Sequence, residues 1–288
     1  TCAFHTRFPE YSAVRTGLDA ERFWPLMRRF HSASRAVLVS APTLGAELAA
    51  RGLPQARLWS RGIDRDLFRP GHAPLPELAA LPGPVMLYVG RVSAEKNLPA
   101  FLDAPVIGTK VVVGDGPELE RLRQRYPEVR FMGALSGETL ARAYCSADVF
   151  VFPSRTDTFG LVLIEALACG LPVAAFPVPG PLDVIGADGR GADGKMPATV
   201  GVLHDNLTFA IQRALRLDPL AAAVYGAGFG WDRATDQFEA ALAEAAIPPL
   251  PIPAAALPEM AGSSGTRWAG LARGGAPPGD ATRGRRWP

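Results

Sequence analysis

Short apolar runs alternate with segments of mixed polarity over most of the chain. The runs indicate β-strands at 85–90, 109–113, 129–132, 148–152 and 173–176. The segments between them repeat apolar residues at helical spacing, which predicts helices near 117–126, 136–146 and 160–169. Strands that alternate with helices form parallel sheets covered by helices, so we predict an α/β fold.

A shorter region of similar pattern precedes these strands. It predicts a helix at 19–34, a strand at 36–40 and a helix at 42–51 that ends at Gly52. Residues 70–84 are rich in Pro and Ala, as expected of a linker between domains. Further helices are predicted after the last strand, near 206–217 and 231–246. The pattern therefore predicts part of one sheet domain followed by a second sheet domain.

The two ends of the chain depart from this pattern. The first residue is Thr, and the chain opens in what reads as the middle of a domain, so we interpret it as a fragment without its N-terminal part. Residues 247–288 contain 8 Pro and 7 Gly in 42 positions. Such a segment cannot bury enough apolar area to offset its ordering entropy, so we expect it to be disordered.

Composition narrows the class of protein. With 288 residues, 48% of them hydrophobic and 20% charged, the chain reads as a soluble globular protein of about two domains. A net charge of +2 gives no reason to expect nucleic acid as a partner. Cys2, Cys145 and Cys169 have neither metal-ligand nor disulfide spacing, so we expect reduced thiols. No apolar run is long enough to span a bilayer.

The stretch 153–172 carries the clearest chemical signal. It follows a strand, contains Asp157 before a helix start, and places Glu165 inside an otherwise apolar helix. An ionised carboxylate there is unfavourable unless it is paired or faces a polar ligand. The amides of Phe159, Gly160 and Leu161 would point out of the helix start, toward a phosphate. A plainer reading makes Asp157 or Thr158 an N-cap and lets Glu165 reach solvent or an Arg.

Asp157 and Glu165 are separated by seven residues, with Phe-Gly after the first acid and Ala-x-Gly-x-Pro-Val after the second. This pattern closely resembles the signature of retaining GT-B glycosyltransferases of family 4, the glycosyl transferases group 1. Its residues are most similar to those of bacterial enzymes that build glycolipids or transfer mannose. The family usually has Glu where this chain has Asp157. The resemblance runs from about His5 to about Phe238.

The resemblance implies a GT-B fold, with two Rossmann-like domains built on parallel sheets and the N-terminal domain incomplete here. It also implies that the last helix crosses back to the N-terminal domain. We therefore expect an N-terminal remainder at 1–69, a linker at 70–84, a nucleotide-sugar-binding domain at 85–230, a crossover helix at 231–246 and a tail at 247–288.

Two cations follow the strand at 85–90: Arg91 directly after Gly90, and Lys96 five positions later. By spacing alone, Arg91 and Lys96 suit a diphosphate at the carboxyl end of a strand, but they also fit a solvated surface pair, with Lys96 beside Glu95. In the resembling family, an Arg and a Lys at these positions bind the diphosphate of the donor. The resemblance thus implies that they neutralise the leaving group without a metal, and no cofactor is expected.

A second glycine loop, Gly114-Asp115-Gly116, follows the strand at 109–113. It fails as a dinucleotide fingerprint because Leu119 occupies the position of the third Gly, which also argues against an NAD-dependent oxidoreductase. A tight turn explains most of the loop. The resemblance implies that Gly114 and Gly116 line the nucleotide pocket and that Met132 lies near the nucleobase.

The resemblance also assigns roles to the remaining residues. Glu165 would accept hydrogen bonds from the ribose, and Asp157 from the transferred sugar. His5 would lie near the donor sugar and acceptor, although a lone His is more often structural; Asp183 is taken as structural. The expected catalytic residues are His5, Asp157, Arg91 and Lys96. The expected donor-binding residues are Gly90, Arg91, Lys96, Gly114, Gly116, Met132, Asp157, Phe159, Gly160, Leu161 and Glu165.

The expected reaction is transfer of a hexose from a UDP-sugar or GDP-mannose to a lipid or glycan acceptor. Two alternatives stay open: a non-catalytic partner subunit of GT-B form, and a nucleotide-sugar epimerase of similar fold. We expect a cytoplasmic protein. The segment 22–30 combines helically spaced apolar residues with Arg22, Arg28 and Arg29, so it fits either a helix packed on its sheet or one lying on the anionic inner membrane.

Overall fold

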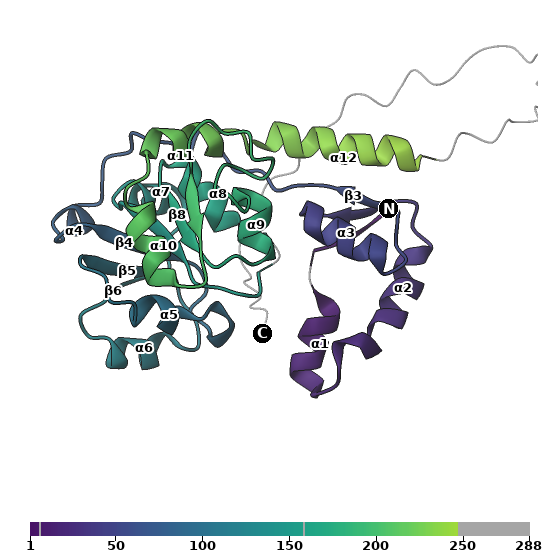
Figure 1. The fold of residues 1–288 in the computed structure, drawn as a ribbon, viewed down its shortest axis with the longest axis horizontal. Coiled ribbons are helices and arrows are strands. Elements are labelled where there is room, and N and C mark those ends of the chain that lie inside the picture. The colour runs from purple at the N-terminus through teal and green to yellow at the C-terminus, as the bar shows by residue number, and fades with distance from the viewer. Residues whose placement is uncertain (6, 158, 247–288) are drawn as a thin grey trace, which may run out of the picture. The chain divides into compact units, whose positions relative to one another are not determined.

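Two parallel β-sheets with flanking helices form the framework of the protein (Figure 1). The computed structural model describes residues 1–5, 7–157 and 159–246. The predicted α/β fold with parallel sheets is therefore confirmed. The tail expected to be disordered, 247–288, lies outside the described residues, and the division into domains at 70–84 stays a prediction.

The larger sheet has six strands in the order β6-β5-β4-β7-β8-β9. These strands are β4 (Val85–Val89), β5 (Thr109–Val113), β6 (Arg130–Gly133), β7 (Val149–Phe152), β8 (Val173–Ala175) and β9 (Gly201–Leu203). Every residue of β4 and β7 is buried, which is why both read as unbroken apolar runs. The strand order reverses between β4 and β7, and ligands of such sheets bind outside the carboxyl ends of the strands at that point.

Alternate side chains of each strand point to opposite faces of the larger sheet, and both sets are apolar. Helices therefore cover both faces. Leu87 of β4 packs in one core cluster, whereas Met86 and Tyr88 pack in the other. The first cluster includes α7 (Gly137–Tyr144), α8 (Leu161–Ala168), α9 (Pro179–Ile185) and α11 (Pro219–Gly226). The second includes α5 (Leu98–Leu102), α6 (Leu119–Arg125) and α10 (Leu207–Ala214).

The smaller sheet has three strands in the order β1-β2-β3. Its elements are β1 (Cys2–Phe4), α1 (Phe8–Thr16), η1 (Ala20–Arg22), α2 (Trp24–Ser32), β2 (Val37–Val39), α3 (Pro42–Ala50) and β3 (Ala56–Leu58). The single helix predicted at 19–34 is wrong: it is split at Phe23 into η1 and α2. Pro25 lies in the first turn of α2, where its missing N–H breaks no helical hydrogen bond.

Most elements that the pattern did not predict are short helices with a proline in their first turn. Besides α1, α5, α9 and α11, they include α4 (Pro76–Ala79), inside the segment read as linker. Proline is a strong turn signal, but it is equally favoured at the first helical positions. These segments therefore looked like loops in the sequence. A strand ending just before His5 was expected, as β1 shows, whereas β3 and β9 were not identified.

The chain passes between the two sheets twice, and the two passages lie side by side. Between β3 and β4, Ile63 forms a parallel bridge with Gly230, and its N–H donates to the carbonyl of Phe229 at 2.9 Å. The helix α12 (Trp231–Ala245) then contacts β3. A side chain on Gly62 would place its Cβ 2.7 Å from the Cα of Trp231, so only glycine fits there.

Candidate functional site

A cavity of about 250 Å³ lies where the strand order reverses, next to the residues that follow β4 and β7. Its lining includes six of the residues predicted from the sequence: Gly90, Lys96, Asp157, Phe159, Gly160 and Leu161. They come from two loops more than fifty positions apart in the chain. The sheet brings these loops together because parallel strands present all their carboxyl ends at one edge.

Lys96 and Asp157 form an ion pair across the cavity. The Nζ of Lys96 lies 2.5 Å from the Oδ1 of Asp157, and each side chain is 22% exposed. Lys96 is the last residue of a short helix, η2 (Ala94–Lys96), and Asn97 after it adopts a left-handed backbone with φ 54°. The Nδ2 of Asn97 donates to the carbonyl of Pro153 at 3.1 Å, which ties the two loops together. The pair is therefore held by the backbone on both sides.

The second carboxylate oxygen of Asp157, Oδ2, is buried and has no hydrogen-bond partner among the residues that the structure describes. A buried acceptor without a donor is unfavourable by about 1–3 kcal/mol. Buried polar groups in native proteins are nearly always paired, by protein, water or ligand. Oδ2 therefore marks a place in the cavity where a hydroxyl or amide donor of a ligand would be bound.

Helix α8 begins at this cavity. Its N-cap is Gly160, with φ 82°, and no side chain of the described residues caps the first turn. The plainer reading of Asp157 as an ordinary N-cap is therefore wrong, and Thr158 lies outside the described residues. An uncapped helix start leaves amide N–H groups and the positive end of the helix dipole available to an anion. With Lys96 beside it, the start of α8 provides the chemistry of a phosphate site.

Glu165 lies on α8 but does not line the cavity. Its Oε2 accepts a hydrogen bond of 2.8 Å from the hydroxyl of Tyr144, a fully buried residue that also contacts Phe150. Burial raises the pKa of the Glu165 carboxyl, and the Tyr144 hydroxyl partly offsets this by lowering it. A carboxylate in this setting favours additional donors, which a ligand would supply.

The glycine loop after β5 is explained mainly by packing. A Cβ on Gly114, where φ is 141°, would lie 1.8 Å from the carbonyl oxygen of Gly90, so the two loops touch through their backbones. The N–H of Gly114 donates to the carbonyl of Gly133 at 2.7 Å. Gly114 and Gly116 do not line the cavity, which agrees with a tight turn.

The structure leaves three further predicted residues outside the cavity lining: His5, Arg91 and Met132. Arg91 is exposed, and its carbonyl accepts a hydrogen bond of 2.8 Å from the Tyr88 hydroxyl. Met132 on β6 packs at the margin of the core. The predicted residues thus form a compact group at Lys96 and Asp157, with the others placed around it.

His5 follows β1 in the smaller sheet, and its ring lies edge-on to Trp59, with centroids 5.2 Å apart. Burial and the charge of Arg61 lower the pKa of His5 from 6.5 to about 4, so the imidazole is neutral at pH 7. Arg61 lines the cavity, and the sequence reasoning missed it. The only signal was its position after β3, and the sequence of that strand, Ala-Arg-Leu, is too polar to read as an apolar run.

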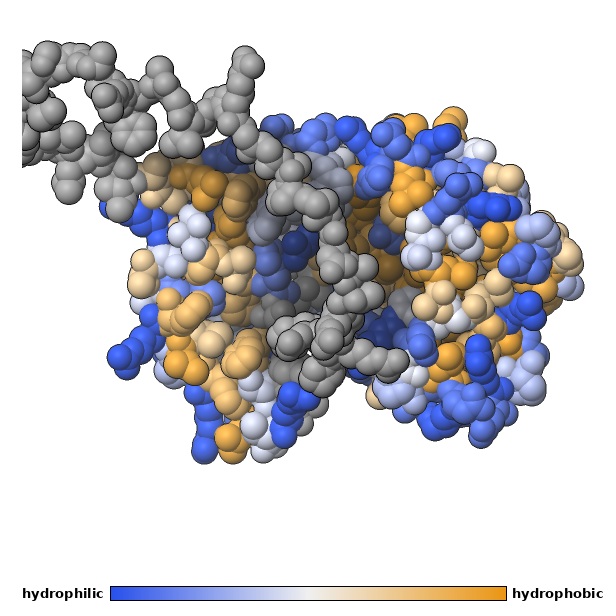
Figure 2. Space-filling view, turned by 180° about the vertical axis from the view of Figure 1, so that it is seen from behind, coloured by the Kyte–Doolittle hydropathy of each residue, from blue (hydrophilic) through white to orange (hydrophobic). Residues whose placement is uncertain are grey.

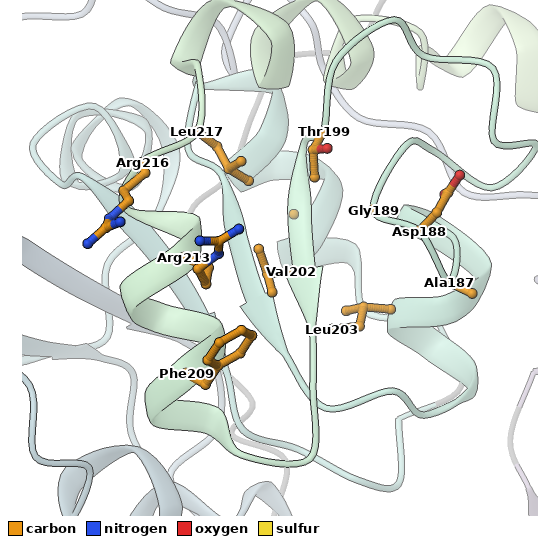
Figure 3. A pocket seen from close by; sticks show the side chains of 11 residues that line it. Ala187, Asp188, Gly189, Thr199, Val202, Leu203, Phe209, Arg213, Arg216 and Leu217 are labelled. Carbon is orange, nitrogen blue, oxygen red and sulfur yellow. The ribbon is translucent and has the colours of Figure 1, made fainter.

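A larger cavity of about 450 Å³ lies beside β9 (Figure 3). Phe209 and Arg213 of α10, with Arg216 just after that helix, line one side of it, and Asp188 lies across the strand from them. Asp188 already accepts the N–H of Arg190 at 3.0 Å and so closes its own turn. This cavity lacks an acid–cation pair comparable to that at β4 and β7. Among the described residues, no three His, Cys, Asp or Glu side chains are grouped to hold a metal ion.

Known proteins resemble this chain in both sequence and structure. Residues 83–214 match the family described as Glycosyl transferases group 1. The chain is 35% identical over 207 residues to the Sulfoquinovosyl transferase SQD2 of Arabidopsis thaliana, which covers 67% of this chain and 40% of that protein. It is 35% identical over 188 residues to a GDP-mannose-dependent alpha-mannosyltransferase of Mycobacterium tuberculosis, which covers 63% of this chain and 50% of that protein.

Among solved structures, the chain is similar to sucrose-phosphate synthase from Thermosynechococcus elongatus, with a TM-score of 0.65 and 27% identity. The similarity covers 84% of this chain and 66% of that one. The chain thus spans half or less of the length of the two curated relatives, and about two thirds of this solved structure.

Proposed function

We propose that this chain holds the donor site of a retaining hexosyltransferase. Through residues 83–214 the chain belongs to the glycosyl transferases group 1, and its fold is GT-B. The donor would be a nucleotide diphosphate sugar, either a UDP-sugar or GDP-mannose. The acceptor would be a lipid or a glycan. The match to curated glycosyltransferases supports the reaction class.

One observation carries the proposal: the Lys96–Asp157 pair lies in a cavity at the start of α8. Within the part of the chain that the structure describes, Oδ2 of Asp157 has no hydrogen-bond partner and no side chain caps α8. The Lys96 ammonium and the α8 amides suit the donor diphosphate. The free carboxylate oxygen of Asp157 suits a hydroxyl of the transferred sugar. Glu165 would accept hydrogen bonds from the ribose.

Retention would proceed by attack on the same face of the sugar from which the nucleotide leaves. The bond between the anomeric carbon and the β-phosphate oxygen breaks, the acceptor oxygen bonds to that carbon, and the acceptor proton passes to the departing phosphate. Lys96, Arg91 and the amides at the start of α8 would stabilise the charge that develops on the phosphate. His5, neutral at pH 7, would orient the acceptor.

The experiment that tests this function is a donor panel. The complete gene product is incubated with UDP-sugars and GDP-mannose, and release of UDP is compared with release of GDP. We expect one nucleotide to be released, with activity that survives a metal chelator, since cationic side chains serve the leaving group. Loss of activity that Mg²⁺ or Mn²⁺ restores would contradict metal independence. Nucleotide binding without turnover would favour a non-catalytic subunit. Formation of product in the absence of an acceptor would favour an epimerase.

We further propose that α2 binds an anionic membrane surface, where a lipid acceptor would lie. Trp24 and His31 are buried against the smaller sheet, whereas Leu26 and Phe30 are 58% and 66% exposed. The arginines of the same segment are close to them in sequence. Figure 2 shows apolar and polar residues interspersed over the part of the molecule that holds the smaller sheet. Such a face suits peripheral binding to acidic lipid.

Among the helices that the structure describes, none is both long enough and apolar enough to cross a membrane. The proposed contact is one of a helix lying along the surface.

A further inference from the structure

Two cysteines meet at the end of the larger sheet's helix layer. Cys145 is the C-cap residue of α7, and Cys169 is the C-cap residue of α8. The structure places both thiols on the lining of one cavity, where their side chains interact, although their spacing in the sequence suggested no pairing. Both are free thiols in this structure. Helix packing, rather than sequence motif, creates this pair.

The two thiols line a cavity of about 600 Å³ that is separate from the candidate donor site. Cys145 is partly exposed, whereas only 6% of Cys169 is exposed. The Sγ of Cys145 also approaches the carbonyl of Arg69 at 3.4 Å, and His72 lines the same cavity. A small molecule that enters the cavity would therefore meet Cys145 first and have Cys169 behind it.

The surroundings divide the roles of the two sulfurs. The hydrogen bond from Cys169, with smaller contributions from His72 and Arg69, lowers the pKa of Cys145 to about 6. Donation of that hydrogen bond and burial raise the pKa of Cys169. These shifts favour the thiolate at Cys145, the more exposed of the two sulfurs, over one at Cys169. Thiolates are the attacking species in thiol–disulfide exchange.

We propose that Cys145 and Cys169 form a thiol–disulfide exchange site that reacts with small disulfides. The Cys145 thiolate attacks one sulfur of the small disulfide, forms a mixed disulfide and releases one small thiolate. Cys169 then gives up its proton and attacks the Sγ of Cys145, which releases the second small thiolate. The protein dithiol is oxidised by two electrons to a disulfide, and the small disulfide is reduced to two thiols.

The site adjoins residues that hold Glu165. Tyr144, whose hydroxyl donates to Glu165, directly precedes Cys145, and the N–H of Cys169 donates to the carbonyl of Glu165 at 3.0 Å. Cys2 provides an internal control, because it lies in β1 of the smaller sheet, 2.9 Å from Nδ1 of His31.

The test uses the full chain, equilibrated with mixtures of reduced and oxidised glutathione and then alkylated. We expect intact mass to show two hydrogen atoms fewer and a single alkyl group, on Cys2, against three alkyl groups when dithiothreitol precedes alkylation, and peptide mapping to link Cys145 with Cys169. In Cys169→Ser, a stable glutathione adduct should accumulate on Cys145, at least tenfold above that on Cys2. In Cys145→Ser, the linkage should be lost and Cys169 should stay unmodified.

Cys2→Ser should behave as the wild type. A wild-type protein that stays fully reduced when oxidised glutathione is in excess overturns the proposal, as does linkage through Cys2. Equal adducts on Cys2 and Cys145 in Cys169→Ser would also overturn it. If Cys169→Ser does not fold, as judged by circular dichroism, the wild-type map and Cys145→Ser decide the question.

Discussion

The two sheets differ in how they hold their charged groups. In the larger sheet, Lys96 is paired with Asp157, and Glu165 is held by Tyr144, so each acid has a partner from the same sheet's own loops or helices. In the smaller sheet, His5 is kept neutral by burial and by Arg61. The larger sheet therefore contains a polar site whose charged groups are already paired. The smaller sheet contributes His5, whose protonation state is set by burial and by Arg61.

This difference indicates where a ligand would act. At the larger sheet a ligand would exchange with contacts that already exist, with the diphosphate competing for Lys96 and a sugar hydroxyl adding to Asp157. At the smaller sheet a ligand would change the surroundings of His5. Substitutions in the larger sheet should therefore change turnover and donor affinity, whereas substitutions in the smaller sheet should change membrane binding and acid stability.

The largest effect is expected at Lys96. Lys96→Ala should lower turnover by about 10²–10³, the usual loss when one group that stabilises developing charge is removed. Arg91→Ala should also lower turnover, and by less, because Arg91 is exposed and does not line the cavity. Steady-state kinetics with the preferred donor measure both.

Lys195→Ala is the matched control, since Lys195 forms an exposed pair with Asp193 elsewhere. If Lys96→Ala retains as much activity as this control, Lys96 does not stabilise the leaving group, and the larger sheet does not contain the proposed donor site.

At Glu165, donor affinity and stability should move in opposite directions. Glu165→Gln should weaken nucleotide binding about tenfold to a hundredfold, since a hydrogen bond to a charged group contributes about 1.5–3 kcal/mol. The raised pKa of Glu165 means that folding is most favoured below the ordinary carboxyl pKa and that this stability is lost as pH rises through the folded value. At pH 7 the Gln variant should therefore be at least as stable as the wild type.

Titration calorimetry with UDP and GDP, and thermal unfolding at pH 7, measure the two effects. Glu138→Gln, an exposed residue in the first turn of α7, is the control. Unchanged nucleotide affinity, or an unfolded Glu165→Gln protein, would remove Glu165 from the donor site.

The smaller sheet should be the one that binds membranes. Changing Arg22, Arg28 and Arg29 together to Gln should weaken sedimentation with acidic vesicles about a hundredfold at low salt, since each basic residue at such a surface contributes about 1 kcal/mol before salt screens it. Phe30→Ser tests the apolar part of the same face. Equal binding by wild type and triple variant, or no binding at low salt, would leave α2 as a helix packed on its sheet.

The smallest effect concerns acid stability. The pKa of His5 is lowered from 6.5 to about 4 in the folded state, so the unfolded chain binds the proton more readily between these values. Stability should be full above pH 6.5 and fall as the pH drops toward 4, and His5→Gln should flatten this slope. Urea unfolding across pH 4–8 measures it, with the exposed His204→Gln as control. A slope unchanged by His5→Gln would show that His5 is not the group responsible.

The sequence allowed the central part of the larger sheet to be predicted because that part is locally encoded. Strands buried on both faces, such as β4 and β7, are continuous apolar runs. The placement of Asp157 and Glu165 around a helix start also follows from local spacing. The parallel sheet then brings Lys96 to Asp157 without further information, because both follow strands at the same edge.

What could not be predicted depends on contacts between distant segments. Arg61 reaches the cavity from beyond β3, whose sequence Ala-Arg-Leu is not an apolar run. Cys145 and Cys169 are the C-cap residues of α7 and α8, and no spacing in the sequence brings them to one cavity. The N-cap of α8 is Gly160 in a left-handed conformation, whereas the plainer reading of the sequence offered Asp157 or Thr158.

The paired passages of the chain at Ile63 and Gly230 have a mechanical consequence. Because a backbone bridge joins them, the two passages are held against each other at Ile63 and Gly230. Beside this bridge the backbone of Gly62 lies against Trp231, with no room for a side chain. A single methyl group at position 62 would therefore force the two passages apart without altering any side chain that lines the cavity.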